Sequence, residues 1–360
     1  MRKNLCMLIA LFVSAVQAQN ISYRVEGKLD DPSFNGQTIY IMRYDDKSDM
    51  DSTQVVNGKF AFEGKAGDHG LYGVKAGRKF AAFVMDNGTI KVNMDSLYHS
   101  SGTFKNDALT RGWAVADSIE RIKKEKSAEF EDTTLFSREE RRRQWGKYYR
   151  NEYIPAITGH YCRLIKEHPD DGVGEYAFRY LVMYNKPEAV KKAYGSMEEP
   201  LRSLNYVKAN MARYIAMENT EIGKPFVDMK GKAVDGKDVS LSEYVGKGKY
   251  VLVDMWASWC APCRGEMPNV AALYQKYKEK GLVVLGIVVW DRQDKALKAM
   301  TELDISWPQM MEVGEQATEK YGVNGIPHII LFAPDGTILA RDLMGEQLKQ
   351  VVNGVMDKKQ

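Results

Sequence analysis

Short apolar runs, rich in β-branched and aromatic residues and separated by turns that contain glycine, make up the first part of the chain. Residues 55–62 place Asn57-Gly58 between two such runs, and this dipeptide favours the type I′ turn of a β-hairpin. Residues 80–94 have the same form around another Asn-Gly pair and predict a second hairpin. Several short strands joined in this way are typical of a small sandwich or barrel. The pattern therefore predicts an all-β domain over residues 19–103.

Helical spacing replaces this pattern in residues 104–218, which we predict to be a central helical region. Ser137 and Glu140 form a capping-box pattern that opens a long helix. Aromatic and apolar side chains then recur every three or four residues, which indicates a stripe that faces the core. The stripe consists of Trp145, Tyr148, Tyr149, Tyr153, Ile157, Tyr161 and Leu164. Cys162 falls within this stripe, so we expect a buried, unreactive thiol there.

The last part of the chain alternates between strongly apolar runs and helical stretches. Runs this apolar suit central strands that helices cover on both faces. The predicted strands are residues 249–255 and 282–289, the predicted helices are residues 262–280 and 291–303, and a hairpin at 329–341 precedes a final helix at 347–356. This order predicts an α/β layered domain over residues 219–360, so that the whole chain is multidomain.

The first eighteen residues have the pattern of a signal peptide. Arg2 and Lys3 precede an apolar run at residues 5–16, and Val16-Gln17-Ala18 fits a cleavage site. The apolar run is too short to span a bilayer comfortably, and an uncleaved anchor is the alternative. We therefore predict a signal peptide at residues 1–18 and a mature protein in the periplasm or cell envelope.

Composition narrows the function further. The 360 residues carry a net charge of +3, so neither nucleic acid nor an anionic membrane surface is an expected partner. Three of the four cysteines lie beyond the signal peptide, too few for a disulfide scaffold. A structural zinc site needs a second ligand pair, and haem attachment needs a histidine where Arg264 follows the Cys-x-x-Cys motif. We expect no metal and no cofactor.

Cys260 and Cys263, which have Ala261 and Pro262 between them, can close a disulfide and reopen it. They stand where the predicted helix begins, and the free N–H groups and dipole of a helix N-terminus favour a thiolate at Cys260. Arg264 adds positive charge nearby. Cys260 is thus the predicted attacking nucleophile, and Cys263, one turn into the helix, is the predicted resolving thiol.

Residues 254–263, together with Gly325-Ile326-Pro327, resemble the corresponding sequences of proteins with the thioredoxin fold. The loop at residues 223–226 and the run at 263–268 narrow the resemblance to the exported TlpA/ResA-like thiol:disulfide oxidoreductases. The resemblance covers residues 219–360. The β-rich and helical regions before it resemble N-terminal regions that accompany such domains in envelope proteins. For the β-rich region, which has no cluster of His, Asp or Glu that would make a metal or catalytic site, a binding or spacer role is expected.

This resemblance assigns roles to further residues. Asp254 matches the buried carboxylate that acts as acid or base for the resolving thiol, and Glu266 matches a helix glutamate that relays protons. Many exported relatives carry Asn in place of Asp254, and residues 282–289 lack the lysine that thioredoxins pair with this Asp. Pro327 is expected to be cis, and substrate binding is expected at Trp259, Pro262, Ile326 and Pro327.

The resemblance implies an enzyme that reduces or exchanges disulfides of envelope proteins through a Cys260–Cys263 disulfide. Its partners would be disulfide-bonded or thiol proteins, with a membrane electron donor if it works as a reductase. Two other functions stay open. One is a peroxiredoxin-like peroxidase, which shares the fold and the loop at 223–226, and the other is a non-catalytic envelope binding module.

Overall fold

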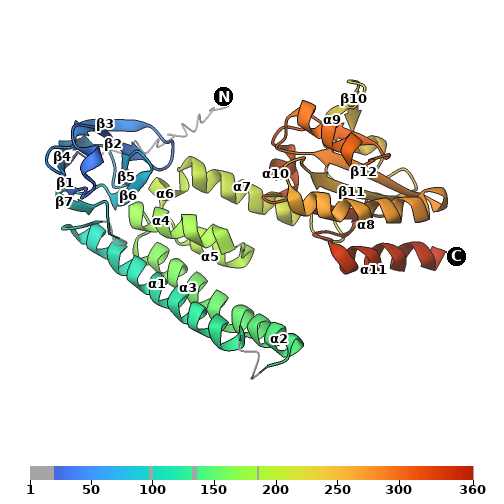
Figure 1. Ribbon diagram of the computed structural model, residues 1–360, viewed down its shortest axis with the longest axis horizontal. Helices are drawn as coiled ribbons and strands as arrows, with labels where there is room; N and C mark the ends of the chain where they lie inside the picture. The colour runs from blue at the N-terminus through green and yellow to red at the C-terminus, as the bar shows by residue number, and fades with distance from the viewer. Residues whose placement is uncertain (1–19, 97–99, 132–135, 185, 360) are drawn as a thin grey trace, which may run out of the picture. The chain divides into compact units, whose positions relative to one another are not determined.

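Two compact units make up the computed structural model, which describes residues 20–96, 100–131, 136–184 and 186–359 (Figure 1). The units divide between Lys208 and Ala209, inside a helix. The predicted signal peptide lies outside the described residues. Within the described ranges, no helix combines the length and the apolar character that crossing a membrane would need.

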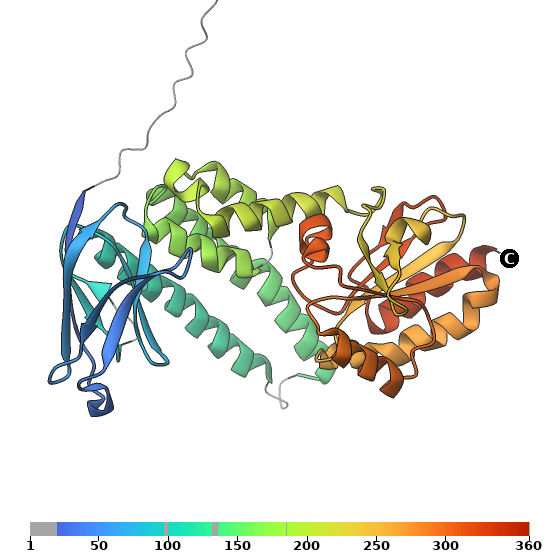
Figure 2. The same ribbon diagram turned by 90° about the horizontal axis from the view of Figure 1, so that it is seen from above.

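The first unit begins with a sandwich of two four-stranded sheets, in the strand orders β4-β1-β7-β8 and β3-β2-β5-β6 (Figure 2). The strands are β1 (Ile21–Lys28), β2 (Thr38–Arg43), β3 (Asp49–Gln54), β4 (Lys59–Ala66), β5 (Leu71–Ala76), β6 (Lys79–Val84), β7 (Gly88–Asn93) and β8 (Ser100–Ser101), with a 3-10 turn η1 (Pro32–Phe34). Alternate residues of the strands point inward and form one apolar core. The predicted all-β region is confirmed.

Both predicted hairpins are corrected by the strand pairing. Asn57 and Gly58 adopt the positive φ angles of 51° and 69° that a type I′ turn requires. The turn closes only a single bridge, however, because β3 and β4 enter different sheets. The hairpin predicted at residues 80–94 is wrong, since β6 pairs with β5 while β7 pairs with β1 and β8. Each turn carries the chain from one sheet to the other.

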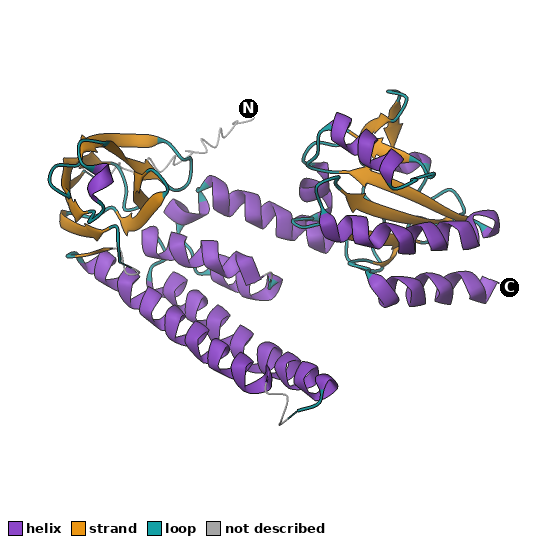
Figure 3. Cartoon of the chain, viewed as in Figure 1, coloured by secondary structure: helices purple, strands orange, loops and turns teal. Residues whose placement is uncertain are grey.

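The helices that follow confirm the predicted helical region (Figure 3). They are α1 (Phe104–Glu131), α2 (Arg138–Tyr148), the π-turn η2 (Tyr149–Tyr153), α3 (Ile154–Glu167), α4 (Gly172–Leu181), the 3-10 turn η3 (Val182–Tyr184), α5 (Pro187–Gly195), α6 (Glu199–Arg202) and α7 (Asn205–Asn219). Ser137 and Glu140 form the capping box of α2. The side chain of Asn106 in α1 pairs with both backbone groups of Val84 on edge strand β6, which fastens the helices to the sandwich.

Cys162 on α3 is only partly buried, which corrects the expected full burial. It lies at the margin of the apolar stripe, between buried Tyr161 and exposed Arg163. Its Sγ lies 3.6 Å from the carbonyl oxygen of Ala189. Partial burial raises the pKa of the Cys162 thiol, so the neutral, less reactive form is favoured.

The second unit is built on a seven-stranded sheet in the order β10-β9-β13-β12-β11-β14-β15 (Figure 1). Its strands are β9 (Lys230–Ala233), β10 (Asp238–Ser240), β11 (Tyr250–Trp256), β12 (Leu282–Val288), β13 (Gln309–Met311), β14 (His328–Phe332) and β15 (Ile338–Ala340). Its helices are α8 (Ala261–Tyr277), α9 (Gln293–Glu302), α10 (Gln316–Tyr321) and α11 (Gly345–Met356), with 3-10 turns η4 (Leu241–Glu243), η5 (Lys278–Lys280) and η6 (Asp357–Lys359). The predicted α/β domain is confirmed.

Central strand β11 is buried on both faces, as its apolar run predicts. It runs parallel to β12 and antiparallel to β14. Leu252 and Trp256 pack into a core with residues of α8 and α11, whereas Val253 and Met255 pack into the other core with residues of α10. The helix that begins after β11, α8, therefore starts at the carboxyl end of the central strand.

Candidate active site

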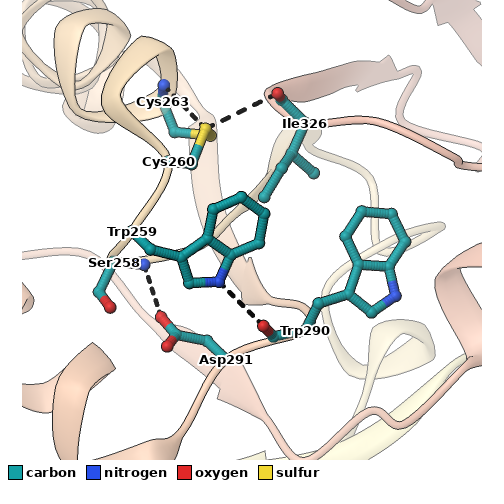
Figure 4. The surroundings of a disulfide bond; sticks show 7 residues. All are labelled: Ser258, Trp259, Cys260, Cys263, Trp290, Asp291 and Ile326. Carbon is teal, nitrogen blue, oxygen red and sulfur yellow. Dashed lines mark hydrogen bonds between the residues drawn. A yellow bond between two sulfur atoms is a disulfide. The ribbon is translucent and has the colours of Figure 1, made fainter. Parts of the chain in front are cut away.

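Cys260 and Cys263 form a disulfide at the N-terminus of α8 (Figure 4). Cys260 is the N-cap residue, and its Sγ accepts a hydrogen bond of 3.1 Å from the backbone N–H of Cys263. Pro262 stands in the first turn, where its lack of an N–H removes no helical hydrogen bond. Both cysteines are buried. The helix N-terminus thus places one donor directly on the sulfur of Cys260.

The loop before β14 faces this disulfide. The peptide bond between Ile326 and Pro327 is cis. The carbonyl oxygen of Ile326 lies 3.7 Å from the Sγ of Cys260, and Figure 4 shows it pointing toward that sulfur. His328, which follows, is a buried residue of β14, and its Nδ1 lies 2.8 Å from a carboxylate oxygen of Asp342. The backbone of Ile326 therefore lies close to the sulfur of Cys260.

Trp259 is the residue before the disulfide, and its side chain is 61% exposed. Trp256, at the end of β11, is fully buried. The indole N–H of Trp259 donates a 2.9 Å hydrogen bond to the carbonyl oxygen of Trp290. The neighbouring N–H of Ser258 donates to the carboxylate of Asp291 at 2.5 Å. These two bonds hold the exposed indole in one position next to Cys260 (Figure 4).

Trp290 and Asp291 were not predicted as site residues. They follow the end of β12, the parallel neighbour of β11, and carboxyl ends of neighbouring parallel strands share one edge of a sheet. Their position directly after this predicted strand is the sequence feature that could have identified them. Trp290 has a φ of 52°, which is rare for a large side chain and often marks a functional turn. A pocket of about 770 Å³ lies beside Trp259, with Trp290, Met311 and Val313 in its lining.

Asp254 lies on β11 and points to the α8 face of the sheet, as Leu252 and Trp256 do. It is 1% exposed, and neither carboxyl oxygen has a hydrogen-bond partner among the described residues. Its register neighbours, Gly286 and Ile329, offer no polar side chain. Burial, and to a lesser extent the charge of Glu266, raises the pKa of Asp254 to about 7.

Glu266 lies within α8 and is only 7% exposed. Its Oε1 accepts two hydrogen bonds of 2.9 Å, from the side chain of Asn269 and from the backbone N–H of Gly345 at the start of α11. The bond from Gly345 connects Glu266 to α11, which is far away in the sequence. Arg264, which we expected to act on Cys260, forms an ion pair with Glu302 of α9 at 3.1 Å.

The side chains at and behind the disulfide suit thiol chemistry and not metal binding. Across the described ranges, no three or more His, Cys, Asp or Glu residues are grouped so that they could hold a metal ion. The arrangement offers one sulfur at a helix N-terminus, a second sulfur behind it, and a buried carboxyl group whose pKa allows it to exchange a proton near neutral pH.

Two family models match the chain. The AhpC/TSA family matches residues 222–341, and a domain of unknown function, DUF4369, matches residues 23–109. Two solved structures are similar to the second unit. The thioredoxin domain of a thiol-disulfide oxidoreductase from Bacteroides vulgatus is 34% identical, covering 38% of this chain and 98% of its own, with a TM-score of 0.36. A thiol:disulfide interchange protein from Bacteroides sp. is also 34% identical, covering 39% and 92%, with a TM-score of 0.36.

Curated relatives carry the same kind of name. The thiol-disulfide oxidoreductase ResA of Bacillus thuringiensis subsp. konkukian (strain 97-27) is 33% identical over 142 residues, which is 39% of this chain and 80% of the relative. ResA of Bacillus subtilis (strain 168) is 25% identical over 123 residues, which is 34% of this chain and 67% of the relative. Through this similarity, which confirms the resemblance found in the sequence, the chain belongs to the ResA family of thiol-disulfide oxidoreductases.

Proposed function

We propose that this oxidoreductase reduces or exchanges disulfide bonds of other proteins, with Cys260 as nucleophile and Cys263 as resolving thiol. The observation that carries the proposal is the Cys260–Cys263 disulfide at the start of α8, with the Ile326 carbonyl on one side and the exposed Trp259 on the other. Both residues lie next to Cys260 (Figure 4), where an incoming chain would meet them.

The reaction begins with the reduced pair. The Cys260 thiolate is stabilised by the N–H of Cys263, which donates to its sulfur, and by the dipole of α8. It attacks one sulfur of the substrate disulfide. The substrate S–S bond breaks, one substrate sulfur leaves as a thiolate and takes a proton, and the other is bound to Cys260 in a mixed disulfide.

Resolution requires Cys263 to lose its proton. The carboxylate of Asp254 accepts this proton, and a pKa of about 7 leaves a large fraction of it ionised at neutral pH. The Cys263 thiolate then attacks the Sγ of Cys260, which closes the disulfide and releases the second substrate thiolate. Two electrons have passed to the substrate. Glu266, beside Asp254 and slightly exposed, relays the proton onward.

Substrate contacts follow from the residues around Cys260. The backbone at Ile326 and Pro327 offers an edge along which an extended polypeptide can add as a strand. The exposed indole of Trp259 gives an apolar platform beside it. Pro262 completes the surface on the helix side.

The partners we propose are thiol or disulfide proteins of the periplasm or cell envelope, reached after export through the predicted signal peptide. When the enzyme works as a reductase, a membrane electron donor returns two electrons to the Cys260–Cys263 disulfide after each cycle. The β-rich domain predicted at residues 19–103 serves as a binding or spacer module.

The test uses insulin as the disulfide substrate. Cys260→Ser should abolish reduction, whereas Cys263→Ser should accumulate mixed disulfides that mass spectrometry can identify. An active Cys260→Ser variant would contradict the assignment. The direction follows from the reduction potential of the pair. A value near about −270 mV indicates a reductase, and a value near about −120 mV indicates an oxidant.

A peroxidase is the second candidate function, because the matching family model is described as AhpC/TSA. A peroxidase that needs only one reactive cysteine would continue to consume peroxide in Cys263→Ser when an external thiol is supplied. Loss of peroxide consumption together with trapped mixed disulfides would favour disulfide exchange. A non-catalytic binding module would show neither reaction in the unmodified chain.

A further inference from the structure

A pocket of about 570 Å³ lies in the first unit, where β6 meets helices α1, α3 and α4. Its size is typical of sites for small molecules, which favour places where two substructures meet. Seven of the residues that line it are aromatic, among them Trp113 of α1, Tyr161 of α3 and Tyr180 of α4. Neither the family comparisons nor the redox chemistry of the second unit gives this pocket a role.

The aromatic rings form a connected wall. Trp113 meets Tyr176 edge to face at 5.8 Å, Tyr176 lies 4.5 Å from Tyr180, and Tyr180 stacks on Tyr161 at 5.8 Å. Tyr180 is 40% exposed, so this wall reaches solvent at the mouth of the pocket. The negative faces of such rings attract cations.

Two carboxylates complete the lining, Asp117 and Glu120, both on α1 and three residues apart. Asp117 is exposed. Glu120 accepts hydrogen bonds from the hydroxyl of Tyr153 and from Lys123. Although burial opposes it, these bonds lower the pKa of Glu120, so the group is charged at neutral pH. None of the described residues that line the pocket carries a positive charge.

Basic side chains gather around the pocket instead of lining it. Arg121, Lys123 and Lys124 line a neighbouring hollow on the other side of Asp117 and Glu120. At the margin, Lys47 and Arg179 lie over the ring of Tyr44, with Nζ and Cζ at 4.8 and 5.4 Å from its centre. The chain's own cations therefore already contact a tyrosine face of this region, and the pocket lining itself consists of aromatic rings, other apolar side chains and the carboxylates of Asp117 and Glu120.

We propose that this pocket binds a small organic cation, an ammonium ion that carries methyl or alkyl groups. The aromatic wall covers the alkyl surface and attracts the charge, and Asp117 and Glu120 on α1, the latter already paired with Lys123, add negative potential at the wall. Anions are disfavoured by the same two carboxylates, and a purely apolar ligand gains nothing from them.

The test compares choline with 3,3-dimethylbutan-1-ol, which has the same shape without the charge. Isothermal titration of the full oxidised chain at low ionic strength should show choline binding at least about tenfold tighter than the alcohol. Equal binding of the two probes would identify an apolar cavity and overturn the proposal, as would no binding of choline. This comparison needs no variant and therefore does not depend on any variant folding.

Variants locate the bound cation. Tyr180→Leu should weaken choline binding about fivefold or more, while Tyr180→Phe should retain it because the ring remains. Tyr40→Leu is the matched control, since Tyr40 is equally exposed on β2 and does not line the pocket. Asp117→Asn should weaken binding a few fold, and Glu125→Gln on the same helix should not. An unchanged affinity in both Tyr180→Leu and Asp117→Asn would overturn this location.

Discussion

The charge of Glu266 adds to burial in raising the pKa of Asp254, so that a carboxyl group without hydrogen-bond partners among the described residues titrates near 7. Asp254 sits on the central strand and Glu266 on the helix that carries both cysteines. In the proposed mechanism this pair keeps a proton acceptor available for Cys263, which is fully buried on the same helix as Glu266. Three predictions depend on it.

Asp254→Asn should slow resolution of the mixed disulfide by about 100-fold while leaving the first attack by Cys260 unchanged, because only the second step needs this base. In the unmodified enzyme the resolution rate should rise with pH around a midpoint near 7, and the variant should lose that rise. Rapid-quench mass spectrometry of the mixed disulfide measures both steps. Asp235→Asn, in an exposed turn, is the control. Equal rates in both steps would exclude the base role.

Asp254 should also make the oxidised protein less stable as pH rises. Its folded pKa of about 7 exceeds the ordinary value of 3.8, so the folded chain holds a proton that the unfolded chain releases between these values. Stability is therefore lost between about pH 4 and pH 7, and Asp254→Asn should be more stable than the unmodified chain at pH 8 by up to about 4 kcal/mol. Urea unfolding at pH 4 and pH 8 measures this difference. Parallel pH dependences would contradict it.

Glu266 allows charge and hydrogen bonding to be separated. Glu266→Gln keeps an oxygen for the N–H of Gly345 but removes the charge, so the midpoint of the resolution step should fall below that of the unmodified enzyme. Glu266→Ala also leaves that N–H without its partner and should cost about 1–3 kcal/mol of stability. Comparing pH profiles and unfolding free energies of the two variants separates the effects. An unshifted midpoint in Glu266→Gln would show that its charge does not reach Asp254.

Local signals in the sequence predict much of the fold, and long-range pairing escapes them. The apolar run of β11 predicts a central strand because such a run must be buried on both faces. Ser137 predicts the start of α2 because it exchanges side-chain to backbone hydrogen bonds with Glu140, only three residues away. Asn57-Gly58 predicts its turn correctly for the same local reason. Which strands then pair depends on packing across the sandwich, so β7 joins β1 in parallel, a partner that no turn residue specifies.

The candidate site likewise has a part that the local sequence predicts and a part that depends on contacts between distant segments. Cys260 and Cys263 lie within one short stretch of the sequence, and their position at the start of a helix follows from the residues around them. The support of Trp259 by Trp290 is a contact between two separate strand ends, without a motif of its own. The hydrogen bond from Gly345 to Glu266 depends on the docking of α11, which a single-sequence pattern does not specify.

Trp259 should contribute binding and not electron transfer. Trp259→Ala removes the exposed platform beside Cys260 and should raise KM for a protein disulfide about tenfold, with little change in the reduction potential of the pair. Trp259→Phe keeps an aromatic face but loses the bond to the Trp290 carbonyl, so an intermediate KM is expected. Trp145→Ala, in the first unit, is the control. A changed kcat with an unchanged KM would contradict a binding role.

The sandwich core offers a stability test that leaves the redox site untouched. Gly27 on β1 lies opposite Phe60 on β4, and a Cβ at position 27 would meet ring carbons of Phe60 at 2.1 to 2.8 Å. Gly27→Ala should therefore destabilise the first unit by about 1–3 kcal/mol, since the buried ring must move within a packed core. Gly67→Ala is the matched control, because a Cβ there meets nothing within 4 Å. Urea unfolding followed by circular dichroism measures the loss, and insulin reduction at 25 °C should be the same in both variants. An equally stable Gly27→Ala variant would mean that Phe60 has free space to move into.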